Sequence, residues 1–335
     1  MKSWIKEIPK AVLHDHLDGG LRVSTLIELA KQQGYEDLPS KDEVELKAWI
    51  QPKPNQTLAL NLEAWAHTIG VMQDKDSLYR VTMEALEDLY NDGVVYAELR
   101  FAPLVHCQKD LSPSDVVNAV VNGVKDGMDK YGIVSGVILC GMRQENNSES
   151  VVDLCIKHDD IIGFDLAGPE IGFSVLNHKN ACKKALENDI AMTLHADWEV
   201  PEGINEVILQ SKAKRIGHGS QIINDVEIKN NNLSFKNKAA KYVFENKIPL
   251  EICPTSNIQC GAFNSIPDHS FGKLYKLGFN VTINTDNRLM SDVSMSEEVS
   301  NVVDAFDLNQ EDIKRITKNT IEAGFVDLEL RKKLL

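Results

Sequence analysis

The chain has 335 residues, a hydrophobic fraction of 43%, a charged fraction of 26% and a formal net charge of −14. This length fits a single α/β barrel, and the composition is that of a globular protein with a large apolar core. The acidic balance argues against binding of nucleic acid or of an anionic membrane through a basic patch, and no uncharged apolar run has the length of a membrane helix.

The cysteines indicate a reducing compartment. All six are scattered along the chain, and none belongs to a Cys-x-x-Cys pair. The first residues contain no apolar region typical of a signal peptide. Cysteines in such a chain are expected to be reduced thiols, so we expect a cytoplasmic protein. The sequence leaves the oligomeric state open.

Eight short apolar segments, several of them rich in β-branched residues, are predicted as strands. In chain order they are Ala11–His16, Val94–Phe101, Ser135–Met142, Ile161–Leu166, Ala191–Ala196, Arg215–His218, Pro249–Pro254 and Asn280–Thr285. Segments with helical spacing separate them, for example Ser114–Lys130, Asn180–Asn188 and Lys236–Asn246. Near-continuous apolar strands that alternate with helices predict a parallel sheet covered on both faces. Eight such units predict an α/β fold of the (β/α)8 TIM barrel type, with residues 1–335 as one domain.

A long insert separates the first two predicted strands. Within residues 21–90, Thr25 and Glu28 have the spacing of a capping box, which predicts a helix start, and Gly34 is a helix stop signal. We expect this insertion to be helical and to cap the mouth of the barrel. Farther along the chain, the polar tract Lys229–Lys238 is expected to be an exposed loop.

Two histidines end the first predicted strand. His14 and His16 are two residues apart, so an extended backbone directs both imidazoles to the same side. Neutral imidazole nitrogen is a good ligand for zinc and related metals. Taken alone, such a pair is more often a partly exposed pair than a metal site, so the rest of the chain must supply further ligands.

Polar residues also follow other predicted strands, where (β/α)8 enzymes carry their chemistry. His195 ends the fifth strand, His218 ends the sixth, and Asp286 follows the eighth. Considered alone, either histidine is typical of a core or loop position, and Asp286 of a helix N-cap. Their joint occurrence with His14 and His16 predicts that all five side chains meet in one mouth.

Six segments then point to a known family. They are Pro9–Arg22, Val95–Pro103, Gly163–Gly168, Arg215–Gly219, Leu250–Asn257 and Asn284–Ser291. With these segments the chain resembles the adenosine deaminase family of the amidohydrolase superfamily, and more closely its bacterial branch. The resemblance covers nearly the whole chain, and the motifs together are highly specific. It implies hydrolytic deamination of adenosine or 2′-deoxyadenosine to inosine or 2′-deoxyinosine, with release of ammonia.

The resemblance also implies a zinc ion, one per chain. The implied ligands share positions at the strand ends: His14, His16, His195 and Asp286. Zinc lowers the pKa of bound water towards neutrality and so makes hydroxide available for attack at C6 of the purine. His218 would orient or stabilise this hydroxide, and Asp286 would help to orient it.

Contacts with the purine nucleoside follow from the same resemblance. The implied residues are His16, Asp18, Gly168 and Asn287. Asp18 would hydrogen-bond a ribose hydroxyl. The backbone of Gly168 would contact the purine, which suits glycine because it lets the backbone approach a flat ring closely. Asn287 lies where family members carry Asp or Asn against the base.

One segment departs from the family pattern. The family motif on the fifth strand is His-Ala-Gly-Glu, and its Glu protonates purine N1 and shuttles the proton. This chain reads His195-Ala196-Asp197-Trp198-Glu199, so an indole, which is only a donor, occupies the expected Glu position. Three outcomes stay open: Glu199 is the catalytic acid, Asp197 serves with a shorter reach, or the activity is lost or changed. We favour Glu199.

Two other functions remain as alternatives. One is deamination of another 6-aminopurine nucleoside, such as aminodeoxyfutalosine, and the part of the mouth that reads the ribose would decide this. The other is a purine-binding protein with impaired catalysis, because the motif Glu is displaced. A glycine-rich phosphate-binding loop is absent from the sequence, so phosphoryl transfer is not expected.

Overall fold

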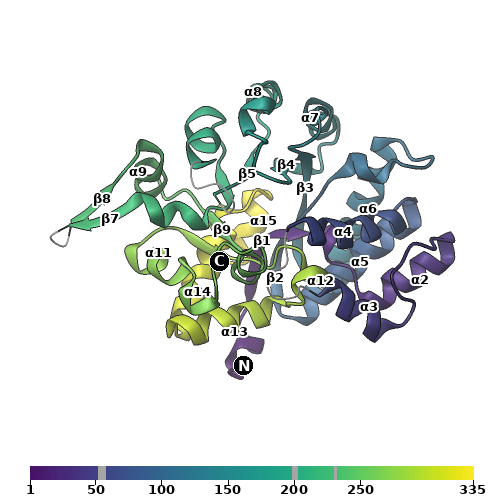
Figure 1. Cartoon of the computed structure of the whole chain (residues 1–335), viewed down its shortest axis with the longest axis horizontal. Helices are drawn as coiled ribbons and strands as arrows, with labels where there is room; N and C mark the ends of the chain where they lie inside the picture. Colours follow the sequence, from purple (N-terminus) through teal and green to yellow (C-terminus); the bar gives the residue numbers. More distant parts are fainter. Residues whose placement is uncertain (52–57, 198–202, 230–231) are drawn as a thin grey trace.

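Eight strands in parallel pairing form the centre of the molecule, and helices surround them (Figure 1). The computed structural model of the chain describes residues 1–51, 58–197, 203–229 and 232–335. The central strands are β1 (Lys10–His16), β2 (Val94–Phe101), β3 (Val134–Met142), β4 (Ile161–Ala167), β5 (Thr193–Ala196), β6 (Arg215–His218), β9 (Leu250–Ile252) and β10 (Val281–Ile283). They make two four-stranded sheets, in the orders β1-β2-β3-β4 and β10-β9-β6-β5.

Isolated parallel bridges join the two sheets at their edges. Phe164 in β4 pairs with Met192, just before β5, and Asp15 in β1 pairs with Asp286, just after β10. The strands therefore follow one another around the centre, and the predicted (β/α)8 barrel is confirmed. Each predicted strand overlaps an observed one, although β5, β9 and β10 are shorter than expected.

The helices lie mostly between successive strands. They are α1 (Trp4–Glu7), α2 (Val23–Gln33), α3 (Glu43–Ile50), α4 (Leu58–Val71), α5 (Lys75–Asn91), α6 (Pro113–Tyr131), α7 (Ser148–Lys157), α8 (Lys179–Glu187), α9 (Lys238–Glu245), α10 (Pro254–Gln259), α11 (Phe271–Leu277), α12 (Arg288–Ser291), α13 (Met295–Phe306), α14 (Gln310–Ala323) and α15 (Leu328–Lys332). In the described residues no helix is both long and apolar enough to cross a membrane.

Local sequence signals explain α6 well. Ser112 and Asp115 form a capping box at its start, and Pro113 occupies the first turn, where its missing N–H is harmless. Gly132 ends the helix in the left-handed conformation with φ 73°. These signals place the helix within a residue of the predicted segment Ser114–Lys130 at either end.

The start of α2 differs from the prediction. The helix begins at Val23 with Arg22 in the N-cap position, so the capping box expected at Thr25 is wrong. Thr25 is buried, and its hydroxyl donates to Glu84 of α5. A tertiary contact has thus taken the hydroxyl that the local pattern assigned to the backbone. The helix does stop at Gly34, with φ 65°, as predicted.

Residues 21–90 hold α2, α3, α4 and α5 between β1 and β2. Thr68 in α4 donates to the backbone oxygen of Asp18 in the short helix η1 (Leu17–Gly19). Arg22 donates to Asp88 of α5 at 2.6 and 3.0 Å. These bonds tie the inserted helices to the segment that directly follows β1.

An antiparallel hairpin projects from the body between β6 and α9 (Figure 1). Its strands are β7 (Val226–Lys229) and β8 (Asn232–Phe235). The exposed loop expected over Lys229–Lys238 is therefore partly wrong, because this tract contains β8 and the start of α9. Val226 and Phe235 pack against the core at the base of the ribbon, whereas Ile228 farther along it is 63% exposed.

Candidate metal centre and substrate pocket

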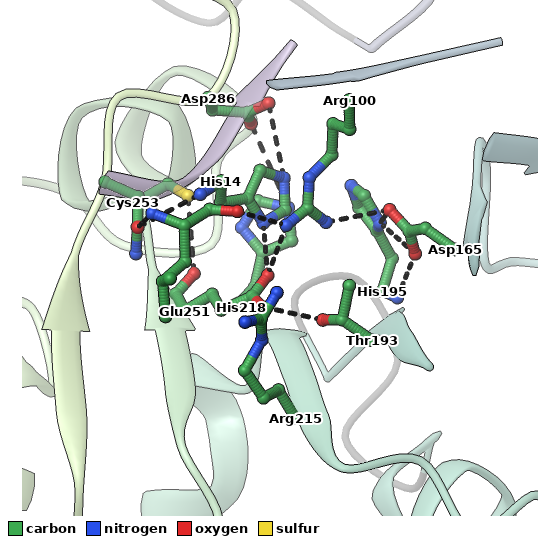
Figure 2. A network of polar contacts seen from close by, with 12 residues as sticks. His14, Arg100, Asp165, Thr193, His195, Arg215, His218, Glu251, Cys253 and Asp286 are labelled. Carbon is green, nitrogen blue, oxygen red and sulfur yellow. Dashed lines mark hydrogen bonds and ion pairs between the residues drawn. The ribbon is translucent and has the colours of Figure 1, made fainter. Parts of the chain in front are cut away.

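Four histidines and one aspartate meet at the carboxyl ends of the strands. His14 and His16 come from β1, His195 from β5 and His218 from β6, and Asp286 follows β10. Figure 2 shows His14, His195, His218 and Asp286 gathered from these separate elements. All five residues are buried, with at most 8% of their surface exposed. The structure thus brings together the residues expected to share one mouth.

The facing atoms are spaced as ligands of one small cation. Nε2 of His16 lies 3.3 Å from Nε2 of His195. Oδ1 of Asp286 lies 3.5 Å from Nε2 of His16 and 3.7 Å from Nε2 of His14. For ligand atoms about 2.1 Å from a tetrahedral ion, neighbouring ligand atoms are about 3.4 Å apart. The donor set and its spacing therefore fit a metal such as zinc.

Carboxylates behind two of the histidines decide which ring nitrogen faces the centre. His14 Nδ1 lies 3.1 Å from Glu251 Oε2, and His195 Nδ1 lies 2.9 Å from Asp165 Oδ2 (Figure 2). An ionised carboxylate only accepts, so Nδ1 carries the proton and Nε2 turns its lone pair inward. Nε2 of His14 is buried without a hydrogen-bond partner among the described residues, which fits an atom that binds a metal ion.

Burial lowers the pKa values of His14, His16 and His218 and so keeps these three imidazoles neutral near pH 7. It lowers the pKa of His14 well below 6.5, lowers that of His16, and lowers the pKa of His218 to about 3. Burial alone would raise the pKa of Asp286, but the interactions with His16 and His218 outweigh it and hold that pKa below its usual value. Neutral imidazole and ionised carboxylate are the forms that bind metals.

A chain of hydrogen bonds sets the tautomer of His218. The backbone N–H of Phe271 donates to Nδ1 of His269, so Nε2 of His269 carries the proton and donates to Asn257 Oδ1 at 3.1 Å. The amide nitrogen of Asn257 then donates to Nδ1 of His218 at 3.1 Å. The proton of neutral His218 is therefore on Nε2, which lies 3.9 Å from Asp286 Oδ2. His218 presents an N–H donor to the centre rather than a lone pair.

A buried ionic network connects the carboxylates that contact His14 and His195. Arg100 donates to Asp165 at 2.8 Å and to Glu251 at 2.7 Å, so one guanidinium joins the carboxylates behind His14 and His195 (Figure 2). The other oxygen of Glu251 accepts from Arg215 at 2.6 Å. Both arginines are at most 1% exposed.

Sequence reasoning did not assign these supporting roles. Asp165 and Glu251 belong to segments that resemble the family, but no role was predicted for either residue. Ser256, whose hydroxyl donates to Asp286 Oδ2 at 2.6 Å, and Asn257 were likewise left without a role. The available signal was a charged residue inside an apolar strand, as in Leu250-Glu251-Ile252.

A cavity of about 100 Å³ opens on this centre. The four residues expected to contact substrate all line it: His16, Asp18, Gly168 and Asn287. Gly168 has φ 93°, a conformation that favours glycine. A neighbouring hollow of about 300 Å³ shares the wall residues Trp65, Ala102, Cys140 and Met142.

The segment that departs from the family motif is only partly described. Trp198 and Glu199 lie outside the described residues. Asp197 is fully buried with φ 62°, does not line the cavity, and has no hydrogen-bond partner for its carboxylate among the described residues. Burial and the nearby Glu170 and Asp225 raise its pKa well above 3.8.

Known proteins match this chain over nearly its whole length. A family model described as adenosine deaminase matches residues 9–335. An adenosine deaminase from Mycolicibacterium vanbaalenii is 42% identical, with 99% of this chain and 94% of its own length covered. The crystal structure of adenine deaminase from Arthrobacter aurescens has a TM-score of 0.88 at 24% identity, covering 98% of this chain and 97% of that one. The N6-methyl-AMP deaminase from Arabidopsis thaliana has a TM-score of 0.82 at 27% identity, covering 99% and 96%.

The barrel, its buried histidine–aspartate centre and these matches define a hydrolase that acts on C–N bonds. Within that class, this chain belongs to the adenosine deaminase family.

Proposed function

We propose that this protein is a zinc-dependent aminohydrolase that converts adenosine and 2′-deoxyadenosine to inosine and 2′-deoxyinosine with release of ammonia. The observation that carries this proposal is the convergence of His14, His16, His195 and Asp286 beside a cavity at the strand ends. Three imidazoles and one carboxylate are a donor set suited to a catalytic zinc ion. The reaction follows from membership of the adenosine deaminase family.

The hydrolytic step needs an oxygen nucleophile that is held against C6 of the purine. A zinc ion held by His14, His16, His195 and Asp286 would lower the pKa of water towards neutrality and so supply hydroxide. His218 would donate from Nε2 to the attacking oxygen, because its hydrogen bond with Asn257 leaves the proton on that nitrogen. Asp286, kept ionised, would accept from the same oxygen and orient it. The water oxygen stays on C6, one water proton goes to N1, and the C6–N bond breaks as the amino group takes the other proton and leaves as ammonia.

The purine is held by Gly168 and Asn287, which both line the cavity. The positive φ of Gly168 and the absence of a Cβ let its backbone approach the ring. Asn287 donates to Oδ1 of Asp286 at 2.9 Å, which supports a role for its amide beside the metal centre. His16 completes this wall and also belongs to the metal centre.

Asp18 supports a nucleoside rather than a nucleotide as substrate. Burial would raise its pKa, but the nearby imidazoles of His106 and His16 lower it, so the carboxyl group is ionised near neutral pH. Oδ1 of Asp18 has no hydrogen-bond partner among the described residues and can accept from a ribose hydroxyl. The same charge repels a 5′-phosphate.

We assign proton transfer to purine N1 to Glu199. This assignment rests on the sequence, because Glu199 lies outside the described residues. The competing Asp197 is buried away from the cavity lining, which supports the choice.

We also propose that residues 21–90 act as a cap on a single barrel domain, since Trp65 of α4 lines the cavity. The six cysteines are free thiols, which supports a cytoplasmic location.

The test is turnover of zinc-loaded protein with adenosine, 2′-deoxyadenosine, AMP, adenine and aminodeoxyfutalosine, followed by ammonia release and by the ultraviolet change from adenosine to inosine. We expect the first two to react, and kcat/KM for AMP to be at least about 100-fold lower because of Asp18. Full zinc content without ammonia from any substrate would instead support a purine-binding homologue. Preference for aminodeoxyfutalosine would support the alternative deaminase.

The acid assignment needs its own variants. Glu199→Gln is expected to lower kcat about 10²- to 10⁴-fold while zinc content stays full. Asp197→Asn is the matched comparison, because it removes a neighbouring carboxylate that does not line the cavity. Activity that survives Glu199→Gln but falls in Asp197→Asn would refute the assignment.

A further inference from the structure

The barrel closes at the place where the metal centre lies. Strands β1 and β2 pair along a ladder from Lys10 to His16. On its other side, β1 is paired in the described part of the chain through one isolated bridge, between Asp15 and Asp286, because β10 already ends at Ile283. The residues from the two ends of the chain are therefore brought together at one of the two junctions that isolated bridges close.

The backbone of Asp286 is held tightly at this junction. Its N–H donates to the carbonyl of His14 at 3.0 Å, and its carbonyl accepts from the N–H of His16 at 3.2 Å. Asp286 has φ 60°, in the left-handed region that side chains other than glycine rarely adopt. A residue in that conformation persists only where its surroundings impose it.

The side chain of Asp15 provides part of that constraint. Asp15 lies between the two histidines of β1, so its side chain points away from theirs, and it is fully buried. Its Oδ2 accepts from Nε of Arg288 at 2.7 Å and from the hydroxyl of Thr285 at 3.0 Å. Thr285 precedes Asp286 and Arg288 follows it. One carboxylate oxygen of Asp15 therefore binds residues on both sides of Asp286.

Arg288 is itself fixed in place. Only 10% of its side chain is exposed, and its Nη1 lies 4.0 Å from Asp88 Oδ2. A Cβ on Gly20 would come within 2.8 Å of its Nη2, so the glycine makes room for the guanidinium. The buried carboxylate of Asp15 needs a cation beside it, and this arginine supplies the charge.

The side chain of Asn284 links β1 to β9 at the same junction. Its Oδ1 accepts from the backbone N–H groups of Leu13 and His14 at 2.9 and 3.2 Å. Its amide nitrogen donates to the carbonyl of Ile252 in β9 at 3.2 Å. A side chain thus replaces the ladder hydrogen bonds that β10 does not extend far enough to make.

We propose that Asp15 and Arg288 are positioning residues that hold Asp286 in register with His14 and His16. The ion pair acts on the metal centre through the backbone, since neither side chain lines the cavity. This inference rests on the proposed function, because it takes these three residues as metal ligands.

Zinc release separates a positioning role from a merely structural one. The holoenzymes of wild type, Arg288→Met, Asp15→Asn and Arg288→Lys are mixed with excess chelator, and a coloured zinc indicator records the rate of release. Both disrupting variants are expected to release zinc about 10- to 100-fold faster, as for other residues that orient ligands. Arg288→Lys keeps the charge and is expected to restore part of the retention.

Two further variants keep the test decisive. Thr285→Val removes the neutral donor to Asp15 without leaving a buried charge unpaired, and is expected to fold and to speed release by a smaller factor. Arg80→Met is the control, because Arg80 forms ion pairs with Glu84 and Glu28 on the inserted helices and touches no residue of the junction. Its zinc release is expected to match wild type.

The thermal midpoint of each metal-free protein is measured in parallel. If Arg288→Met, Asp15→Asn and Thr285→Val had a lower thermal midpoint but released zinc at the wild-type rate, the positioning role would be overturned. The ion pair would then only stabilise the fold of the barrel. Failure of the proposed function looks different, because wild type itself would then lack zinc or fail to deaminate adenosine.

Discussion

Glu298 in α13 offers a sharp test of the electrostatics behind the metal centre. Its carboxyl group is completely buried, and it accepts from the backbone N–H of Thr255 at 2.7 Å and from the hydroxyl of the same residue. These bonds hold the start of α10, where Ser256 donates to Asp286 at 2.6 Å. Burial raises the pKa of Glu298 to about 7.

The raised pKa of Glu298 makes the stability of the folded protein depend on pH. Between the ordinary pKa of 4.5 and about 7, the folded protein keeps a proton on Glu298 that the unfolded chain has released. The stabilisation from this proton is fully present below about pH 4.5 and is lost as pH rises through 7. At 1.36 kcal/mol for each step of one in pKa, the loss amounts to about 3 kcal/mol.

Urea unfolding of wild type and Glu298→Gln measures this loss. Glutamine has the same shape, does not titrate, and keeps one oxygen for the N–H of Thr255. From about pH 5 to pH 8, the free energy of unfolding of wild type is expected to fall by about 2.5 kcal/mol relative to the variant. Comparing the two proteins at each pH under equal metal conditions removes the contribution of other groups. Glu322→Gln, at a half-exposed position, is the control and should show no such trend. A difference between wild type and Glu298→Gln that stays constant over this range would refute the reasoning.

Two predictions concern the buried ionic network. Asp165→Asn removes the charged acceptor behind His195, so zinc affinity measured by chelator competition is expected to fall about 10- to 100-fold, with the exposed Asp160→Asn as the control. Wild-type affinity in Asp165→Asn would contradict its supporting role. Arg215→Met strips the buried Glu98 of its cation, so the free energy of unfolding in urea is expected to fall by about 3 to 5 kcal/mol. A loss under about 1 kcal/mol would mean that the network relaxes or takes up protons instead.

The central strands could be read from the sequence because each is buried on both faces. Such strands appear as short apolar runs, and their number and alternation with helices already indicated the barrel. The convergence of His14, His16 and His195 was also readable. Spacing of two places side chains on one face of a strand, and parallel strands bring their carboxyl ends to one side of the barrel. The roles of these residues as ligands remain a prediction.

Other features depended on contacts between distant segments. Thr25 has a capping pattern, yet its hydroxyl bonds to Glu84 from another helix, and α2 begins earlier. The tract after Lys229 is polar overall and was expected to be a loop, yet Asn232–Phe235 pairs as a strand with Val226–Lys229 just upstream. In both cases a hydrogen-bond partner outside the local pattern decided the structure.

The sequence by itself determined which strands end in imidazoles and carboxylates, because that information is local to each strand. Only the tertiary structure decided what stands behind them. Glu251 meets His14 across 237 residues, and Arg288 meets Asp15 across 273. Such pairs depend on how far each strand is staggered against its neighbour around the barrel. The stagger between two strands cannot be read from the residue spacing within either strand.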